Sequence, residues 1–170
     1  MSEALPAAVD SGWRYLPLAA AIIIADQLSK AWILARLALH DSFTVLPVLD
    51  ILRTHNTGAA FSFLAGAGGW QRWFFTLLAL GISAGIVWWL RRLDGRQQSV
   101  QALGLALVLA GALGNAIDRL RFGYVVDFIG VHWNDAWFPA FNIADASITI
   151  GAGLLLLDAL LEGRRSKVKA

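Results

Sequence analysis

The stretch "FNIADASITIGAGLLLLDALL", which runs from Phe141 to Leu161, is apolar over most of its length. A helix needs roughly 20 mostly apolar residues to cross the hydrocarbon core of a bilayer, so this stretch is long enough to span a membrane. Asp145 lies near its beginning, at the edge of the hydrocarbon, where a carboxylate is costly. The stretch therefore predicts a membrane helix that carries an acidic group for a specific purpose.

The composition of the whole chain also indicates a membrane protein. Of its 170 residues, 58% are hydrophobic and only 15% are charged, whereas a soluble domain carries about 25% charged residues. The net charge of +2 is small, and no basic stripe interleaved with aromatics occurs outside the expected membrane ends, which argues against a nucleic-acid partner. With no cysteine and three scattered histidines, a disulfide, a thiolate nucleophile and a Cys-ligated or His-clustered metal site are not expected.

Four windows are long and apolar enough to be membrane-spanning helices, at about 13–37, 70–90, 100–120 and 142–161. We therefore expect an all-α integral membrane protein that forms a single membrane domain over residues 1–170. A cleaved signal peptide is the alternative for the first window. An uncleaved span is favoured because the window is long, carries Asp26 and Lys30, and is not followed by a small-residue cleavage site.

The basic residues set the expected orientation in the membrane. They concentrate in the link "RRLDGRQQ" (91–98) and in the tail "EGRRSKVKA" (162–170), and such loops are usually cytoplasmic. Both termini should then be cytoplasmic, and segments 38–69 and 121–141 should face outward. The first outer segment is rich in β-branched and aromatic residues with turn signals, which predicts a small β element on the membrane surface. In the second outer segment, we expect the loop after Asp127 to act as a lid.

The polar residues that fit badly into hydrocarbon come from separate segments but fall at one level, near the outer interface. Random placement would scatter them, and ionisable groups within a membrane are functional candidates by default. The residues concerned are Asp26, Lys30, Asn115, Asp118, Arg119, Asp127, Asn142 and Asp145.

Two pairs among them also have a purely structural interpretation. Asp26 and Lys30 are four positions apart with the acid first, the favourable order for an ion pair on a helix. Asn142 suits the N-cap of the last span, with Asp145 as the third helical residue of a capping box. Both interpretations remain open beside a role in a functional site.

Structural roles are equally plausible on the third span. Gly111, Asn115 and Arg119 lie on one helical stripe, where a small residue lets a neighbouring helix approach closely. Asp118 is the neighbour of Arg119 in the sequence, and we interpret it as a local partner of Arg119 rather than as a catalyst.

Asp127 has no such structural role. It interrupts the apolar run "YVVDFIGV" (124–131), where loss of hydration should raise its pKa. Asp145, at a helix N-terminus, lies where the helix dipole favours a negative charge. Two carboxyl groups in unlike environments are what acid–base chemistry needs. If they share one proton they could hydrolyse a peptide bond as an aspartic dyad, with a bell-shaped dependence of activity on pH.

Five short sequence blocks are typical of one family. Taken in order, they resemble lipoprotein signal peptidase, the bacterial signal peptidase II family, over essentially the whole chain. Each block alone is a weak signal, but the order and the spacing of the spans are specific. The blocks are "DQLSK" (26–30), "NTGAAFSF" (56–63), "GALGNAIDR" (111–119), "VVDFI" (125–129) and "FNIADASI" (141–148).

The resemblance implies an inner-membrane aspartic endopeptidase that removes the signal peptide from prolipoproteins. It implies cleavage on the amino side of a cysteine that carries diacylglyceryl lipid, no metal or other cofactor, and sensitivity to the cyclic peptide globomycin. Asp127 and Asp145 match the catalytic pair of the family. Residues matching those that support the dyad or contact substrate are Asp26, Asn56, Gly111, Asn115, Arg119 and Asn142, and Lys30 joins them as the partner of Asp26. The expected partners are the lipid-modified prolipoprotein, membrane lipid and a globomycin-type inhibitor. A nucleic-acid partner is not expected, and a monomer is the default.

Two other classes of function remain as alternatives from the residues alone. A small proton-coupled transporter or channel would also place carboxylates between spans, but it would need polar residues at mid-depth and on both sides of the barrier. A non-catalytic membrane scaffold would explain the glycines and the ion pairs. It would not explain two carboxylates that flank one outer segment.

Overall fold

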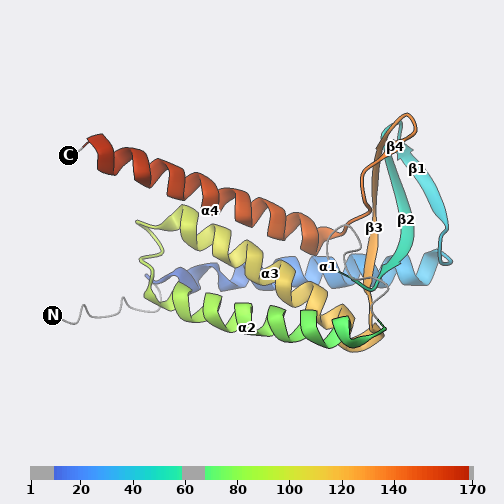
Figure 1. Cartoon of the computed structure of the whole chain (residues 1–170), viewed down its shortest axis with the longest axis horizontal. Coiled ribbons are helices and arrows are strands. Elements are labelled where there is room, and N and C mark those ends of the chain that lie inside the picture. Colours follow the sequence, from blue (N-terminus) through green and yellow to red (C-terminus); the bar gives the residue numbers. More distant parts are fainter. Residues whose placement is uncertain (1–9, 59–67, 169–170) are drawn as a thin grey trace.

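Four long helices dominate the computed structural model, which describes residues 10–58 and 68–168, with side chains up to residue 161. A short 3₁₀ helix, η1 (Gly12–Tyr15), leads into α1 (Leu16–Arg36). The other helices are α2 (Trp70–Arg92), α3 (Ser99–Phe122) and α4 (Ile143–Val168) (Figure 1). Residues 59–67 of the first outer segment, and with them most of the "NTGAAFSF" block, lie outside the described residues.

These helices are apolar and long enough to cross a membrane over Gly12–Arg36, Trp70–Arg92, Ser99–Phe122 and Ile143–Leu161. The four predicted spans are therefore confirmed, with ends that differ by at most two residues. The chain is a multi-pass membrane protein. Many large apolar side chains of the helices are exposed on the surface of the protein, as expected for side chains that face lipid.

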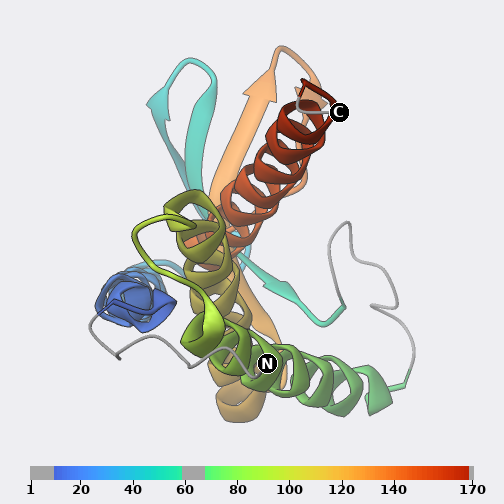
Figure 2. The same ribbon diagram turned by 90° about the vertical axis from the view of Figure 1, so that its left-hand side faces the viewer.

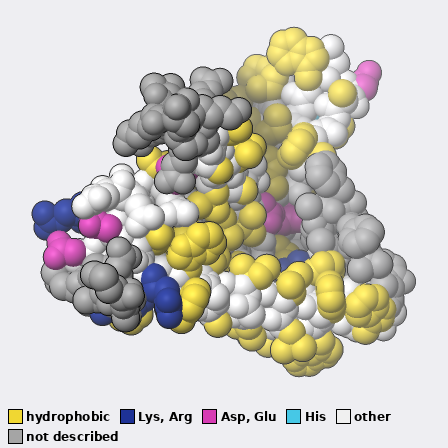
Figure 3. Space-filling model, turned by 60° about the vertical axis from the view of Figure 1, so that its left-hand side comes forward, with side chains coloured by type: hydrophobic (Ala, Val, Ile, Leu, Met, Phe, Trp, Pro, Cys, Tyr) yellow, Lys and Arg dark blue, Asp and Glu magenta, His cyan; other side chains and the backbone are white. Residues whose placement is uncertain are grey.

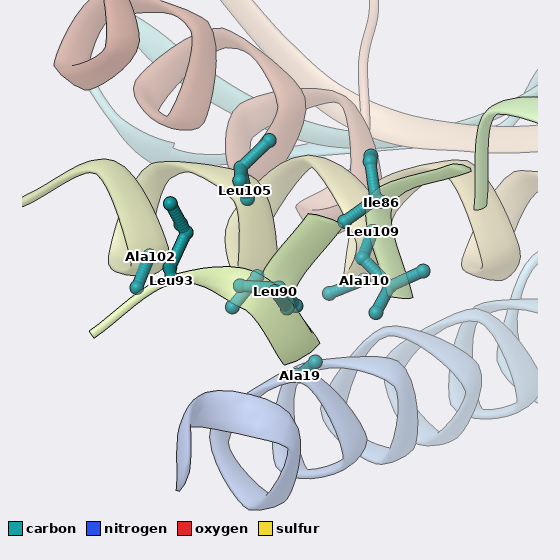
Figure 4. Close-up of a cluster of buried hydrophobic side chains, with 9 residues drawn as sticks. Ala19, Ile86, Leu90, Leu93, Ala102, Leu105, Leu109 and Ala110 are labelled. Atoms are coloured by element: carbon teal, nitrogen blue, oxygen red, sulfur yellow. The ribbon is translucent and has the colours of Figure 1, made fainter. Parts of the chain in front are cut away.

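Helix α3 is the centre of the bundle and packs against α1, α2 and α4 (Figure 2). Away from the sheet, its alanine and leucine side chains form an apolar core with α1 and α2 (Figure 4). Small residues bring α3 and α4 together: a Cβ on Gly151 would lie 2.6 Å from the carbonyl oxygen of Gly104, and a Cβ on Gly111 would collide with the carbonyl oxygen of Ala144. This close approach places the start of α4 against the second half of α3.

One antiparallel sheet stands across the end of the helix bundle where α3 ends and α4 begins (Figure 1). Its strands are β1 (Ser42–Leu46), β2 (Leu49–Asn56), β3 (Val125–Trp133) and β4 (Ala136–Trp137), in that order. Strands β2 and β3 pair Thr54 with Asp127. The predicted β element is confirmed, and the sheet brings β1 and β2, from before α2, beside β3 and β4, from after α3.

The segment 121–141, which was expected as an outer loop with a lid after Asp127, is strand over Val125–Trp133 and Ala136–Trp137. In β3 the residues from Val125 to Phe128 are buried on both faces. A strand buried on both faces has a continuous apolar run without the alternation that marks a half-exposed strand. Asp127 therefore lies within a paired strand rather than in a loop.

Candidate active site

The sheet-side ends of α1, α3 and α4 and the start of β3 carry buried polar side chains that meet at one place. Independent parts of the chain deliver them, as expected from their positions in the sequence. Buried there are Asp26, Lys30, Asn115, Asp118, Arg119, Asp127 and Asn142, with Asn56 and Asp145 half-buried beside them.

Asn142 connects the two candidate catalytic carboxylates. Its side-chain oxygen accepts from the backbone N–H of Asp145 at 2.9 Å, and its own backbone N–H donates to Asp145 Oδ2 at 3.3 Å. This reciprocal pair is the predicted capping box at the start of α4. The side-chain Nδ2 of Asn142 also donates to Asp127 Oδ1 at 2.7 Å. One asparagine thus caps the helix and contacts both carboxylates.

Asp127 is almost fully buried on β3. Its residue is 2% exposed, and Asn56 on the neighbouring strand β2 donates to its Oδ2 at 3.1 Å. Burial, together with the negative charge of Asp145, raises the pKa of Asp127 to about 7, while the amides of Asn56 and Asn142 oppose this rise. A carboxyl group with this pKa can carry a proton at neutral pH.

Asp145 is oriented by a second asparagine. Asn115 Nδ2 donates to Asp145 Oδ1 at 2.7 Å, and Asn115 Oδ1 accepts from Lys30 Nζ at 3.1 Å. Because a lysine ammonium group can only donate hydrogen bonds, the oxygen of Asn115 has to face Lys30. The amide NH₂ of Asn115 is then directed at Asp145.

The expected ion pair of α1 is present and fully buried. Lys30 Nζ lies 2.8 Å from Asp26 Oδ2 and 2.9 Å from Asp118 Oδ2. Asp26 Oδ1 also accepts from the backbone N–H of Ala144 at 3.0 Å, in the first turn of α4. The pair therefore does more than stabilise α1, because it fixes the end of α4 that carries Asp145.

Two features of α3 complete the surroundings of the carboxylates. Arg119 Nη2 donates to the carbonyl oxygen of Gly58 at 2.7 Å, and its guanidinium carbon lies 5.3 Å from the ring centroid of Phe75. Gly111 leaves room for the backbone of Ala144. The structure thus brings all nine residues singled out from the sequence into one region.

Asp118 and Gln27 are the residues of this region whose part the sequence did not reveal. Asp118 pairs with Lys30 and not with Arg119, because consecutive residues on a helix point in different directions. Gln27 Nε2 donates to Asp118 Oδ1 at 2.9 Å and to Asp26 Oδ2 at 3.2 Å. The only signal for Gln27 was its place between the two charged ends of "DQLSK".

Figure 3 shows acidic side-chain atoms set back from the surface, with hydrophobic side chains beside them. In residues 10–58 and 68–161, no group of three or more histidine or acidic side chains is arranged to hold a metal ion. A separate apolar cavity of about 330 Å³ lies at the far end of the sheet, where Val48, His132 and Phe138 contribute to its wall. It is not part of the polar region.

A comparison with protein families identifies the chain. The family model for Signal peptidase (SPase) II matches residues 18–161. The chain belongs to the signal peptidase II family. It therefore belongs to peptidases that process prolipoproteins, and the resemblance stated from the five blocks is confirmed.

Individual relatives agree over nearly the full length. The chain is 49% identical to the lipoprotein signal peptidase of Shewanella pealeana, over 93% of this chain and 92% of the relative. It is 51% identical to that of Shewanella woodyi, over 89% and 85%. A solved "Bacterial membrane enzyme structure by the in meso method at 2.3 A resolution" matches with a TM-score of 0.80 at 36% identity, covering 91% of each chain.

Proposed function

We propose that this chain is an intramembrane aspartic endopeptidase in which Asp127 and Asp145 are the catalytic residues. It removes the signal peptide from diacylglyceryl-modified prolipoproteins and cuts on the amino side of the lipidated cysteine. The proposal extends the family's general activity to a mechanism, a cleavage position and named residues. The observation that carries it is Asn142, which bonds at once to both carboxylates.

The geometry supports a division of work between the two carboxyl groups. Asp127 is the more buried and has a pKa of about 7 because of burial and the charge of Asp145, so it holds the shared proton. Asp145 lies at the N-terminus of α4, where the helix dipole favours a negative charge, so it acts as the base. Asn56, Asn115 and Asn142 donate to the carboxylate oxygens and keep the two side chains in place.

In the reaction, Asp145 takes a proton from a water molecule as the water oxygen attacks the scissile carbonyl carbon. A C–O bond forms, and the negative charge that develops on the carbonyl oxygen is stabilised by hydrogen bonds. The tetrahedral intermediate then collapses and the C–N bond breaks. Asp127 gives its proton to the departing amine of the cysteine. The signal peptide leaves with a new carboxyl group and no cofactor is required.

The position of the site suits a lipid-bearing substrate. Polar groups gather at the sheet-side ends of three of the four apolar helices, and many large apolar side chains of these helices are exposed. Acyl chains could stay in the bilayer while the scissile bond reaches the carboxylates. We assign the sheet side to the outer face of the bacterial inner membrane, with both termini cytoplasmic and the chain acting as a single-domain monomer. Globomycin-type cyclic peptides would act at the same site.

Asp127→Asn and Asp145→Asn, made singly, test the assignment. Each preserves size but removes a group that must donate or accept a proton, so cleavage of a diacylglyceryl-modified prolipoprotein should fall by at least about 1000-fold. The measurement is the rate of cleavage by purified protein at matched abundance, with Asp135→Asn in the outer segment as a control that keeps wild-type activity. Cleavage at near the wild-type rate by either dyad variant would remove that residue from the catalytic pair.

A further inference from the structure

Asp118 is a fully buried carboxylate that the proposed reaction does not use. It lies on α3 one turn before the end of the helix, and it accepts from three groups on two other segments, α1 and β3. Lys30 Nζ on α1 lies 2.9 Å from its Oδ2, Gln27 Nε2 lies 2.9 Å from its Oδ1, and the backbone N–H of Val126 on β3 lies 3.1 Å from its Oδ2. Such a carboxylate holds several elements at fixed positions.

One of these contacts leads to the first catalytic carboxylate. Val126 immediately precedes Asp127, and its N–H bond to Asp118 ties the start of β3 to the end of α3. The carbonyl of Val126 in turn accepts from Asn142 Nδ2 at 3.3 Å. The backbone that carries Asp127 is therefore held from both sides, at a helix and at the bridging asparagine.

Another contact leads to the second catalytic carboxylate. Asp118 holds the ammonium group of Lys30, Lys30 donates to Asn115 Oδ1, and Asn115 Nδ2 donates to Asp145 Oδ1. Each link has one possible direction, because the lysine can only donate and an ionised carboxylate can only accept. The orientation of the Asn115 amide thus depends on where Lys30 is held.

We propose that Asp118 is a positioning residue that sets the relative placement of Asp127 and Asp145. The inference rests on the proposed function and deepens it. Asp118 makes none of the described contacts to either carboxylate; it acts on one through the strand backbone and on the other through Lys30 and Asn115. Errors of about 1 Å in such placement can lower a rate on the order of 100-fold.

The charges of the cluster make Asp118→Asn a suitable variant. Asp26, Lys30 and Asp118 together carry one excess negative charge, so the substitution leaves Asp26 and Lys30 as a balanced pair and should allow folding. The ammonium group of Lys30 is then less neutralised, and its positive charge lowers the pKa of Asp127. The charged groups that surround Asp127 from the packed elements are Asp26, Lys30, Asp118, Arg119 and Asp145.

The experiment compares Asp118→Asn with Asp50→Asn, the same change at another buried carboxylate. Asp50 lies on β2 beside His132, with 3.6 Å between Asp50 Oδ1 and His132 Nε2, and it belongs to none of these contacts. For Asp118→Asn we expect kcat on the prolipoprotein to fall roughly 10–100-fold with KM within about twofold, because substrate contacts are kept. The alkaline limb of the pH–rate profile should move to lower pH. Asp50→Asn should match wild type in kcat and in the position of the alkaline limb.

Each outcome decides a different claim. A wild-type kcat and an unmoved alkaline limb in Asp118→Asn would overturn the positioning role, whereas cleavage by Asp127→Asn or Asp145→Asn would overturn the proposed function itself. If Asp118→Asn does not accumulate, Gln27→Met removes a neutral neighbour that holds Asp118 in place. Gln27→Met should lower kcat several-fold without moving the alkaline limb of the pH–rate profile. A wild-type kcat in Gln27→Met would also overturn the positioning role.

Discussion

The two halves of the helix bundle are built from opposite kinds of side chain, although α3 runs through both. Away from the sheet, α3 contributes Ala102, Leu105 and Leu109 to an apolar core. Two turns further on, the same helix buries Asn115 and Asp118 in a network of ion pairs and hydrogen bonds. One helix thus serves as an anchor in its first half and as part of the candidate active site in its second.

This difference shows which half is shaped by function. Buried ion pairs contribute little net stability, because the desolvation of two charges offsets their attraction. Within a membrane such groups are costlier still, and they persist where a function needs them. The apolar half should therefore determine how stable the protein is, and the polar half should determine what it does.

Matched glycine substitutions on α3 should separate the two halves with the largest effect. Gly111→Ala brings a methyl group into the carbonyl oxygen of Ala144, next to Asp145, so α4 has to move at the site. Cleavage should fall on the order of 100-fold. Gly104→Ala meets the carbonyl oxygen of Gly151 at 3.0 Å and a side-chain carbon of Leu155, which a small local shift can relieve. It should keep activity within a few-fold.

The measurement is kcat/KM on a lipid-modified prolipoprotein, with the midpoint of thermal unfolding in detergent recorded beside it. Equal losses of activity in the two variants would mean that the halves of α3 are not functionally distinct. Both substitutions would then act only by disturbing the packing of α3 against α4.

In the apolar half of the bundle, a substitution should lower stability and leave activity unchanged, and this effect is expected to be smaller. Leu90 on α2 is fully buried and packs against Gly12 of η1. Leu90→Ala removes packing contacts and should lower the free energy of unfolding by about 2 kcal/mol, or roughly 5 °C in Tm, while kcat below that temperature stays unchanged. Scanning calorimetry and the cleavage assay check the two parts. A large loss of kcat in folded Leu90→Ala would contradict the division between the halves.

Much of the membrane fold could be predicted from the sequence, because its strongest signal is simple. About 20 mostly apolar residues in a row are typical of a membrane-spanning helix and rare in soluble domains, and the predicted spans end close to the observed helices. Local polar signals were also reliable. The Asp26–Lys30 pair and the Asn142–Asp145 capping box depend on spacing along one helix, which can be counted directly along the chain.

What could not be predicted depends on contacts between distant segments. The strand β3 was expected as loop because burial on both faces removes the alternation that identifies a strand. Asp118 was assigned to its neighbour in sequence, whereas its partners Lys30 and Val126 come from another helix and from the sheet. The sequence could indicate which residues gather at one level of the membrane but not which of them touch.

The titration of Asp127 tests most directly the claim that two carboxyl groups share a proton. Burial favours the neutral form, so Asp127 should be protonated below pH 7 and lose its proton as the pH rises through about 7. Infrared difference spectra of wild type and Asp127→Asn, taken between about pH 5 and pH 9, would follow the carboxyl band. The account predicts a protonated-carboxyl band that disappears near neutral pH in wild type and is missing in Asp127→Asn. The same titrating band in both proteins would contradict it.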